Sequence, residues 1–195
     1  MPTIADLDTP TVLIDIDRVE ANLKRAQAHA DKEGYALRPH TKTHKLPQFA
    51  KRQIELGARG ITVQKLGEAE VMADAGVDDI FLPYNIVGDK KLTRLQALND
   101  RITLAVTADS PDTISGYART FTSGKPLTVL IECDTGAGRC GVQTPAQALA
   151  LARQIELAPG LRFGGLMTYP PKHGLEKSNA WFDEALANFK QAGIA

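Results

Sequence analysis

The most constraining feature of this sequence is the alternation of short apolar runs, typical of strands, with longer segments of helical periodicity. Because parallel strands need a crossover connection, usually a helix, this alternation predicts a parallel sheet covered by helices. The predicted strands lie at 11–16, 35–40, 60–63, 79–82, 102–106, 127–131 and 161–167. The predicted helices lie at 17–34, 47–57, 68–75, 90–98, 111–121, 145–157 and 178–191.

Local signals place the ends of these helices. Asp17 is the predicted cap of the first helix, and Glu20 lies three residues after Asp17, which is the spacing of a capping box. Gly34 ends the helix. Thr144 is a predicted cap, and Pro145 stands at a favoured first helical position. The joints between elements are therefore short, as in a compact α/β domain.

Counting from Tyr35 gives six β/α units, preceded by one further strand and helix, so we divide the chain into 1–34 and 35–195. An eight-fold β/α barrel typically needs about 250 residues. We expect the chain to be the first part of a larger protein, ending where a seventh strand would begin. Six parallel strands also suit an open doubly wound sheet, so counting alone leaves both architectures open.

Composition excludes several classes of function. The formal net charge is zero and there is no run of Lys or Arg, which argues against nucleic-acid binding and anionic membranes. No apolar stretch reaches the length of a membrane span, and the N-terminus lacks a secretory signal, so we expect a cytoplasmic protein. Cys133 and Cys140 lack CxxC spacing and are predicted to be reduced, buried packing residues. His40 and His44 are four apart, but Pro39 disfavours the helix that a zinc pair would need.

Polar residues follow most of the predicted strands, where ligands bind in parallel α/β folds. They are His40, Lys42, His44 and Lys45 after the first barrel strand, Gln64 and Lys65 after the second, Tyr84 and Asn85 after the third, 133–139 after the fifth, and 168–171 after the sixth. A lysine, an arginine and tyrosines around one opening predict an anionic, aromatic ligand.

Lys42 is the leading candidate among them. Neighbouring cations and partial burial favour the neutral amine of a lysine, which is the form that attacks an aldehyde. Lys45 and Lys65 are competitors, and a plain solvated charge is the alternative for each. Arg139 ends a Gly-rich turn that lacks dinucleotide-binding spacing; it is either a ligand for a carboxylate or phosphate, or a surface charge. Tyr169 either stacks on a planar cofactor or packs at the core rim.

Four sequence runs resemble one family. They are Asp-Thr-Pro-Thr-Val-Leu-Ile-Asp at 8–15, Leu-Arg-Pro-His-Thr-Lys-Thr-His-Lys at 37–45, Gly-Ile-Thr-Val at 60–63 and Leu-Gly-Glu-Ala-Glu at 66–70. They resemble the D-threonine aldolase and D-serine dehydratase family, which belongs to the alanine-racemase-like, fold-type III group of pyridoxal phosphate enzymes. The resemblance covers essentially all 195 residues.

The resemblance implies roles for several residues. Lys42 aligns with the lysine that holds pyridoxal phosphate as a Schiff base, and Arg139 is similar to the arginine beside that lysine and the substrate. Tyr169 falls where the racemases carry a ring against the cofactor, but it departs from the Tyr-x-His pattern of the dehydratase branch. We also predict cofactor contacts for His40 and Gln64.

The resemblance also implies an architecture, namely a TIM-type (β/α)8 barrel with about six of eight units present and a C-terminal β domain largely missing. A phosphate-binding cradle and a His-with-Cys-or-Asp pair for Mn, Mg or Zn are expected beyond Ala195, and we predict no metal ligand within the chain. Family members suggest a homodimer when full length. We expect the isolated 195-residue segment to bind the cofactor weakly or not at all and to be inactive.

The function predicted from these residues is cleavage of a β-hydroxy-D-amino acid to glycine and an aldehyde. A first alternative keeps the cofactor but changes the bond: dehydration of D-serine or 3-hydroxyaspartate, or racemisation of an amino acid. A second alternative is a non-catalytic pyridoxal phosphate carrier in cofactor homeostasis. The run Gly165-Leu166-Met167 and the prolines after it resemble a segment of such proteins. Product analysis separates these three.

Overall fold

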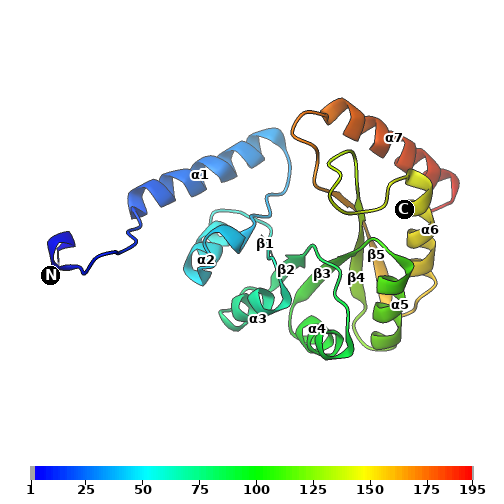
Figure 1. Cartoon of the computed structure of the whole chain (residues 1–195), viewed down its shortest axis with the longest axis horizontal. Helices are drawn as coiled ribbons and strands as arrows, with labels where there is room; N and C mark the ends of the chain where they lie inside the picture. The colour runs from blue at the N-terminus through cyan, green and yellow to red at the C-terminus, as the bar shows by residue number, and fades with distance from the viewer. Residues whose placement is uncertain (1–2, 195) are drawn as a thin grey trace.

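The computed structural model of the chain describes residues 3–194 (Figure 1). One parallel sheet contains β1 Ile61–Thr62, β2 Asp79–Leu82, β3 Thr103–Ala108, β4 Leu127–Cys133 and β5 Leu161–Thr168. The α-helices are α1 Ile16–Glu33, α2 Pro47–Glu55, α3 Leu66–Asp74, α4 Asp89–Arg101, α5 Pro111–Thr120, α6 Pro145–Glu156 and α7 Leu175–Gln191. Two short 3₁₀ helices, η1 Ile4–Asp6 and η2 Thr41–Thr43, lie in the N-terminal part.

The strand order decides between the two predicted architectures. The five strands pair in parallel in the order β1-β2-β3-β4-β5, so each strand lies beside its neighbour in the chain. Each helix from α2 to α7 packs against the next one along the chain, which places them on one side of the sheet (Figure 1). A doubly wound sheet reverses its strand order and carries helices on both faces. The arrangement is instead that of part of a β/α barrel, as predicted.

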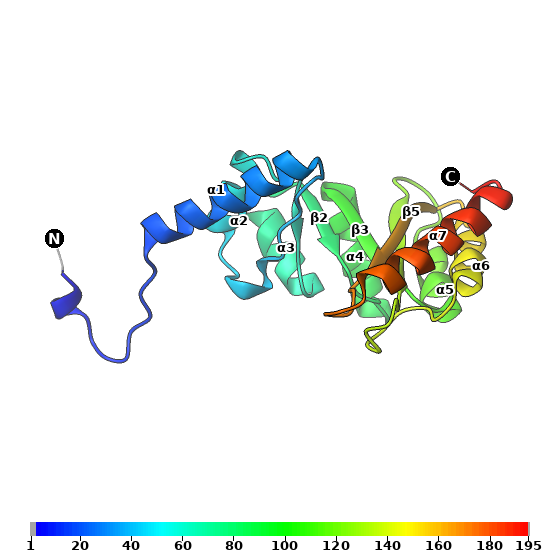
Figure 2. The same cartoon turned by 90° about the horizontal axis from the view of Figure 1, so that it is seen from above.

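The predicted strand at 11–16 is wrong. Residues 11–15 have no regular structure, and Val12 is 91% exposed. A β-branched run forms a strand only against a neighbouring strand, and this segment lies apart from the sheet, on the far side of α1 (Figure 2). The helix begins at Ile16, and Asp15, not Asp17, is its cap, because the Asp15 carboxylate accepts the backbone N–H of Arg18 at 3.0 Å. Gly34 ends this helix in the left-handed conformation, as predicted.

The predicted strand at 35–40 is also not a regular strand. The segment runs beside β1: the backbone N–H of Arg59 donates to Leu37, that of Thr62 donates to Pro39, and His40 forms an isolated parallel bridge with Thr62. Pro39 has no backbone N–H, so it cannot donate to a continuous ladder. The described chain therefore contains five regular strands where six barrel strands were predicted. The other predicted elements are confirmed, with shifts of at most three residues at their ends.

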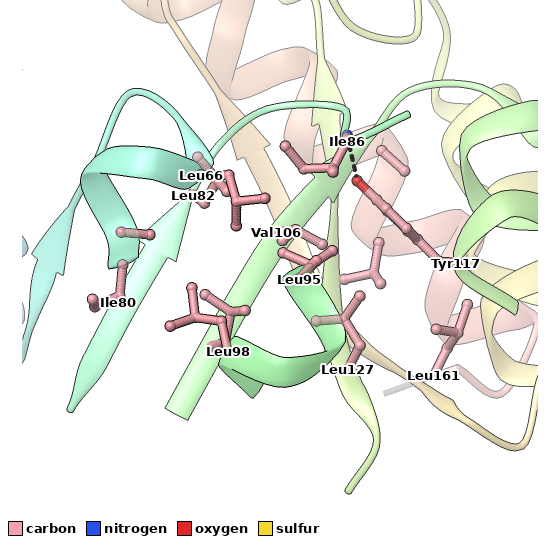
Figure 3. Close-up of a cluster of buried hydrophobic side chains, with 14 of the residues drawn as sticks. Leu66, Ile80, Leu82, Ile86, Leu95, Leu98, Val106, Tyr117, Leu127 and Leu161 are labelled. Atoms are coloured by element: carbon pink, nitrogen blue, oxygen red, sulfur yellow. Dashed lines mark hydrogen bonds between the residues drawn. The ribbon is translucent and has the colours of Figure 1, made fainter. Parts of the chain in front are cut away.

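Tyr117 connects the core to the edge of the sheet where the site lies. Its side chain is fully buried among apolar residues between the sheet and the helices (Figure 3). Its hydroxyl donates to the carbonyl of Thr107 at 3.0 Å and accepts the backbone N–H of Ile86 at 2.9 Å. Burial raises the pKa of Tyr117, so the phenol stays protonated and keeps donating. These bonds fix the loop after β2, which carries Tyr84 and Asn85.

Replacing Tyr117 with Phe removes a donor and an acceptor from inside the core. The N–H of Ile86 and the carbonyl of Thr107 lose this partner, so we expect unfolding free energy to fall by about 1–3 kcal/mol. Urea unfolding followed by circular dichroism measures this. The matched control is Tyr35→Phe, at a tyrosine that is 49% exposed, with an expected change within about 0.5 kcal/mol. Equal stability of the two variants would show that the buried hydroxyl does not stabilise the loop.

Candidate active site

A cavity of about 340 Å³ lies at the carboxyl ends of the strands. All five site residues predicted from the sequence line it: His40, Lys42, Gln64, Arg139 and Tyr169. They come from the segment before β1 and from the ends of β1, β4 and β5, so chain positions 129 residues apart meet here, from His40 to Tyr169 (169 − 40). Its volume is within the range of small-molecule sites.

Lys42 is carried by η2, a single 3₁₀ turn. The buried hydroxyl of Thr41 donates to the carbonyl of Thr62 at 3.2 Å, which ties the turn to β1. The backbone N–H of Lys42 donates to Nδ1 of His40 at 3.3 Å. Lys42 itself is exposed, so the expected partial burial of its amine is wrong. What distinguishes it is a side chain that lines the cavity and forms no salt bridge with any residue in 3–194.

The two competing lysines lie elsewhere. The Nζ atom of Lys45 pairs with Oε1 of Glu68 at 2.6 Å, and Lys45 does not line the cavity. Lys65 stands at the N-terminal end of α3 and lines an adjoining cavity. This geometry favours Lys42 for contact with a ligand in the central cavity.

Arg139 projects from a turn that its own sequence shapes. The Asp134 carboxylate accepts the backbone N–H groups of Gly136 and Gly138 at 2.9 and 3.0 Å. Gly141 has a φ of 106°, and a Cβ there would meet backbone atoms of the preceding strand at 2.7 Å, so the chain can turn back only with glycine. The Arg139 guanidinium carbon lies 4.7 Å from the ring centroid of Tyr169, a cation–π contact.

Burial, together with the nearby charges, sets the protonation state of His40. Burial lowers the pKa of His40, and the positive charge of Lys42 lowers it further, while Glu68 and a hydrogen bond with Thr62 act in the opposite direction. The imidazole is therefore neutral at pH 7, which agrees with Nδ1 accepting the N–H of Lys42. A neutral imidazole adds no repulsion to the two cations, Lys42 and Arg139, of the same cavity.

Six of the residues that line the cavity were not predicted as site residues, and Glu132 and Cys140 are two of them. Glu132 is buried near the end of β4, and its Oε1 accepts the thiol of Cys140 at 2.9 Å. Partial loss of hydration around the sulfur and this bond to Glu132 raise the pKa of Cys140 to about 11, so it is a thiol and not a nucleophile at neutral pH. The prediction that both cysteines are buried is right for Cys133 and wrong for Cys140, which is exposed. The sequence signal that could have identified Glu132 is a single carboxylate near the end of a mainly apolar strand.

Asn85 presents an unpaired acceptor at the same cavity. Its Nδ2 donates to the Asp109 carboxylate at 2.7 Å, while its buried Oδ1 has no hydrogen-bond partner among residues 3–194. Buried polar atoms are nearly always paired, so an orphan beside a cavity indicates where a ligand or water donates. Within residues 3–194 there is no group of three His, Cys, Asp or Glu side chains placed to hold a metal ion. In the same range, no helix combines the length and apolar character needed to cross a bilayer.

The proximity of Lys42 and His40 can be tested without any ligand. Lys42→Met removes the positive charge that lowers the pKa of His40, so that pKa should rise. Histidine resonances followed by NMR across a pH titration measure it. Lys65→Met is the control, because Lys65 lines a different cavity and should leave the His40 pKa unchanged. An unchanged His40 pKa in Lys42→Met would place the ammonium away from the imidazole.

Several known proteins are similar to this chain. A D-threonine aldolase from Arthrobacter sp. is 42% identical over 167 residues, a match covering 85% of this chain and 44% of that protein. A D-threo-3-hydroxyaspartate dehydratase from Delftia sp. (strain HT23) is 35% identical over 196 residues, covering 98% of this chain and 50% of that protein. The crystal structure of D-threonine aldolase from Filomicrobium marinum superimposes with a TM-score of 0.92 at 33% identity, covering 98% of this chain and 55% of that one.

The chain thus spans about half the length of the curated relatives it matches. The sequence model of the family described as "Alanine racemase, N-terminal domain" matches residues 14–194. That range contains all five strands and every residue that lines the cavity. The chain belongs to the alanine racemase N-terminal domain family.

Proposed function

We propose that the protein is a pyridoxal-phosphate-dependent lyase that cleaves β-hydroxy-D-amino acids to glycine and an aldehyde. The observation that carries the proposal is the convergence of Lys42, Arg139 and Tyr169 on one cavity, from the segment before β1 and from the ends of β4 and β5. The names of the relatives, a D-threonine aldolase and a 3-hydroxy-D-aspartate aldolase among them, support the substrate class.

The cavity fits this cofactor in size and chemistry. It offers an amine without an ion-pair partner in the described chain, an aromatic ring, and the orphaned Oδ1 of Asn85. In the proposal Lys42 would hold the cofactor through its aldehyde, and Tyr169, His40 and Gln64 would contact it from the cavity wall. When bound, the cofactor withdraws electrons from the α-carbon of an attached amino acid, which weakens the bonds to that carbon.

The chain's own residues orient the substrate. Arg139 has no carboxylate partner in the described part of the chain, so its guanidinium can bind the substrate carboxylate through two hydrogen bonds. The Tyr169 ring holds that guanidinium over the cavity. The neutral His40 accepts a hydrogen bond from the backbone N–H of Lys42. Because the imidazole is uncharged, it adds no positive charge beside the Lys42 amine.

Dehydration is the second candidate, because the Delftia dehydratase is 35% identical across 98% of this chain. Both reactions start from a β-hydroxy-D-amino acid and differ in the bond that breaks. Cleavage of Cα–Cβ releases glycine and an aldehyde, whereas loss of the β-hydroxyl ends in an oxo acid and ammonia. The departure of Tyr169 from the Tyr-x-His pattern supports the aldolase.

The products of the full-length protein with D-threonine decide between these reactions. We expect glycine and acetaldehyde, measured by amine chromatography and an aldehyde-reductase assay, and no turnover of L-threonine. Lys42→Ala should lower kcat/KM by at least about 10³-fold, because the nucleophile is lost. Arg139→Lys should raise KM by about tenfold or more, because lysine cannot form the paired hydrogen bonds.

The control is Lys65→Ala, which removes a lysine outside the cavity and should retain activity. Oxo acid and ammonia as the sole products would replace the aldolase with a dehydratase. Bound cofactor with no turnover of either kind would identify a carrier, and retained activity in Lys42→Ala would overturn the assignment of the lysine.

A further inference from the structure

Glu68 joins the turn that carries Lys42 to the end of β1. Its side chain is only 9% exposed, in the first turn of α3. Oε1 accepts Nζ of Lys45 at 2.6 Å, and Oε2 accepts the backbone N–H of Gln64 at 2.9 Å. One carboxylate therefore contacts Lys45, in the segment before β1, and Gln64, two residues after the end of β1. Gln64 lines the cavity.

The segment held by Glu68 is residues 40–45, which we call the lysine turn. It closes on itself at Lys45, whose backbone N–H donates to the carbonyl of Thr41 at 2.7 Å. Lys45 has a φ of 57°, a left-handed conformation that a residue with a side chain rarely adopts. Such a conformation persists only where surrounding contacts hold it. The pair with Glu68 is the contact that the Lys45 side chain makes within residues 3–194.

Glu68 keeps its charge despite burial. Burial raises the pKa of the Glu68 carboxyl, but the hydrogen bonds from Lys45 and Gln64 together with nearby lysine charges outweigh it, so its pKa is lowered overall. At neutral pH the group is an anion with both oxygens used. Lys45, in contrast, is 61% exposed, so its side chain can be replaced without opening a cavity in the core, although Oε1 of Glu68 then loses this partner.

We propose that Glu68 is a positioning residue: through Lys45 and Gln64 it sets the lysine turn so that Lys42, and not Lys45, faces the cavity. The proposal rests on the proposed function in which Lys42 binds the cofactor. By neutralising Lys45 at a fixed place outside the cavity, Glu68 also removes the nearest competing amine on the same turn.

The test compares where pyridoxal phosphate attaches. The full-length protein is incubated with the cofactor, reduced with borohydride and mapped by peptide mass spectrometry. In the unaltered protein the label should concentrate on Lys42 over Lys45 and Lys65. In Glu68→Gln, which keeps the size and an acceptor for the Gln64 N–H, the ratio of Lys42 to Lys45 label should fall about tenfold, as expected when a charged hydrogen bond is lost.

The matched control is Glu70→Gln on the same helix. Glu70 pairs with Arg94 on α4, away from the lysine turn, so the labelling ratio should not change. Hydrogen–deuterium exchange without cofactor gives a second measurement. Amides of the lysine turn should exchange faster in Glu68→Gln and in Lys45→Met, but not in Glu70→Gln.

The titration of His40 separates electrostatic placement from general loosening. The charged groups around His40 are Lys42 on its own turn, Glu68 on α3, and Glu132 and Arg139 from β4 and its loop. Because the negative charge of Glu68 raises the pKa of His40, Glu68→Gln should lower that pKa. Lys45→Met frees the turn but retains the Glu68 charge that raises the pKa of His40, so that pKa should not fall in this variant.

Each result decides one of the two proposals. If the unaltered protein shows no preference for Lys42, the assignment of the cofactor lysine fails, while exchange and titration still test Glu68. If Lys42 is preferred and Glu68→Gln keeps the same ratio, the positioning role fails. If Glu68→Gln does not fold, Lys45→Met removes the same ion pair from its exposed end, and an unchanged ratio and exchange rate there overturn the proposal.

Discussion

Parallel pairing in chain order is the constraint on which the rest of this structure depends. Because each strand lies beside its sequence neighbour and runs in the same direction, all carboxyl ends meet at one edge of the sheet. The loops after β1, β2, β4 and β5 thereby face one another across a single cavity. No local feature of those loops produces this convergence; it follows from strand direction and order alone.

A second set of bonds makes the convergent loops definite in shape. Thr41 ties the lysine turn to β1, Tyr117 holds the loop after β2, and Asp134 closes the turn before Arg139. Each bond joins a site loop to a rigid element or closes the loop on itself. The loops that carry the functional side chains are therefore held in one conformation relative to the sheet. Glu68 adds the contact that separates two lysines three residues apart in the chain.

A second, larger cavity does not coincide with this site. A groove of about 840 Å³ lies between β5 and α7 and is lined mainly by apolar side chains such as Phe163, Leu166 and Phe189. Lys190 is its one charged lining residue in the described chain. An apolar groove can bury surface, but it offers no convergent polar groups to orient a substrate. Chemistry is therefore assigned by the residues at the strand ends and not by cavity size.

The sequence alone determined the helices, most of the strands and the five candidate site residues, because apolar periodicity, caps and strand-end motifs are local signals. It misplaced the first helix cap and predicted strands at 11–16 and 35–40, since a strand exists only where a partner and unbroken N–H donors are available. The tertiary structure alone decided the barrel order, the exposure of Cys140 beside Glu132, and the pairing of Lys45 with Glu68. Those features depend on contacts between segments distant in the chain, which no local pattern records.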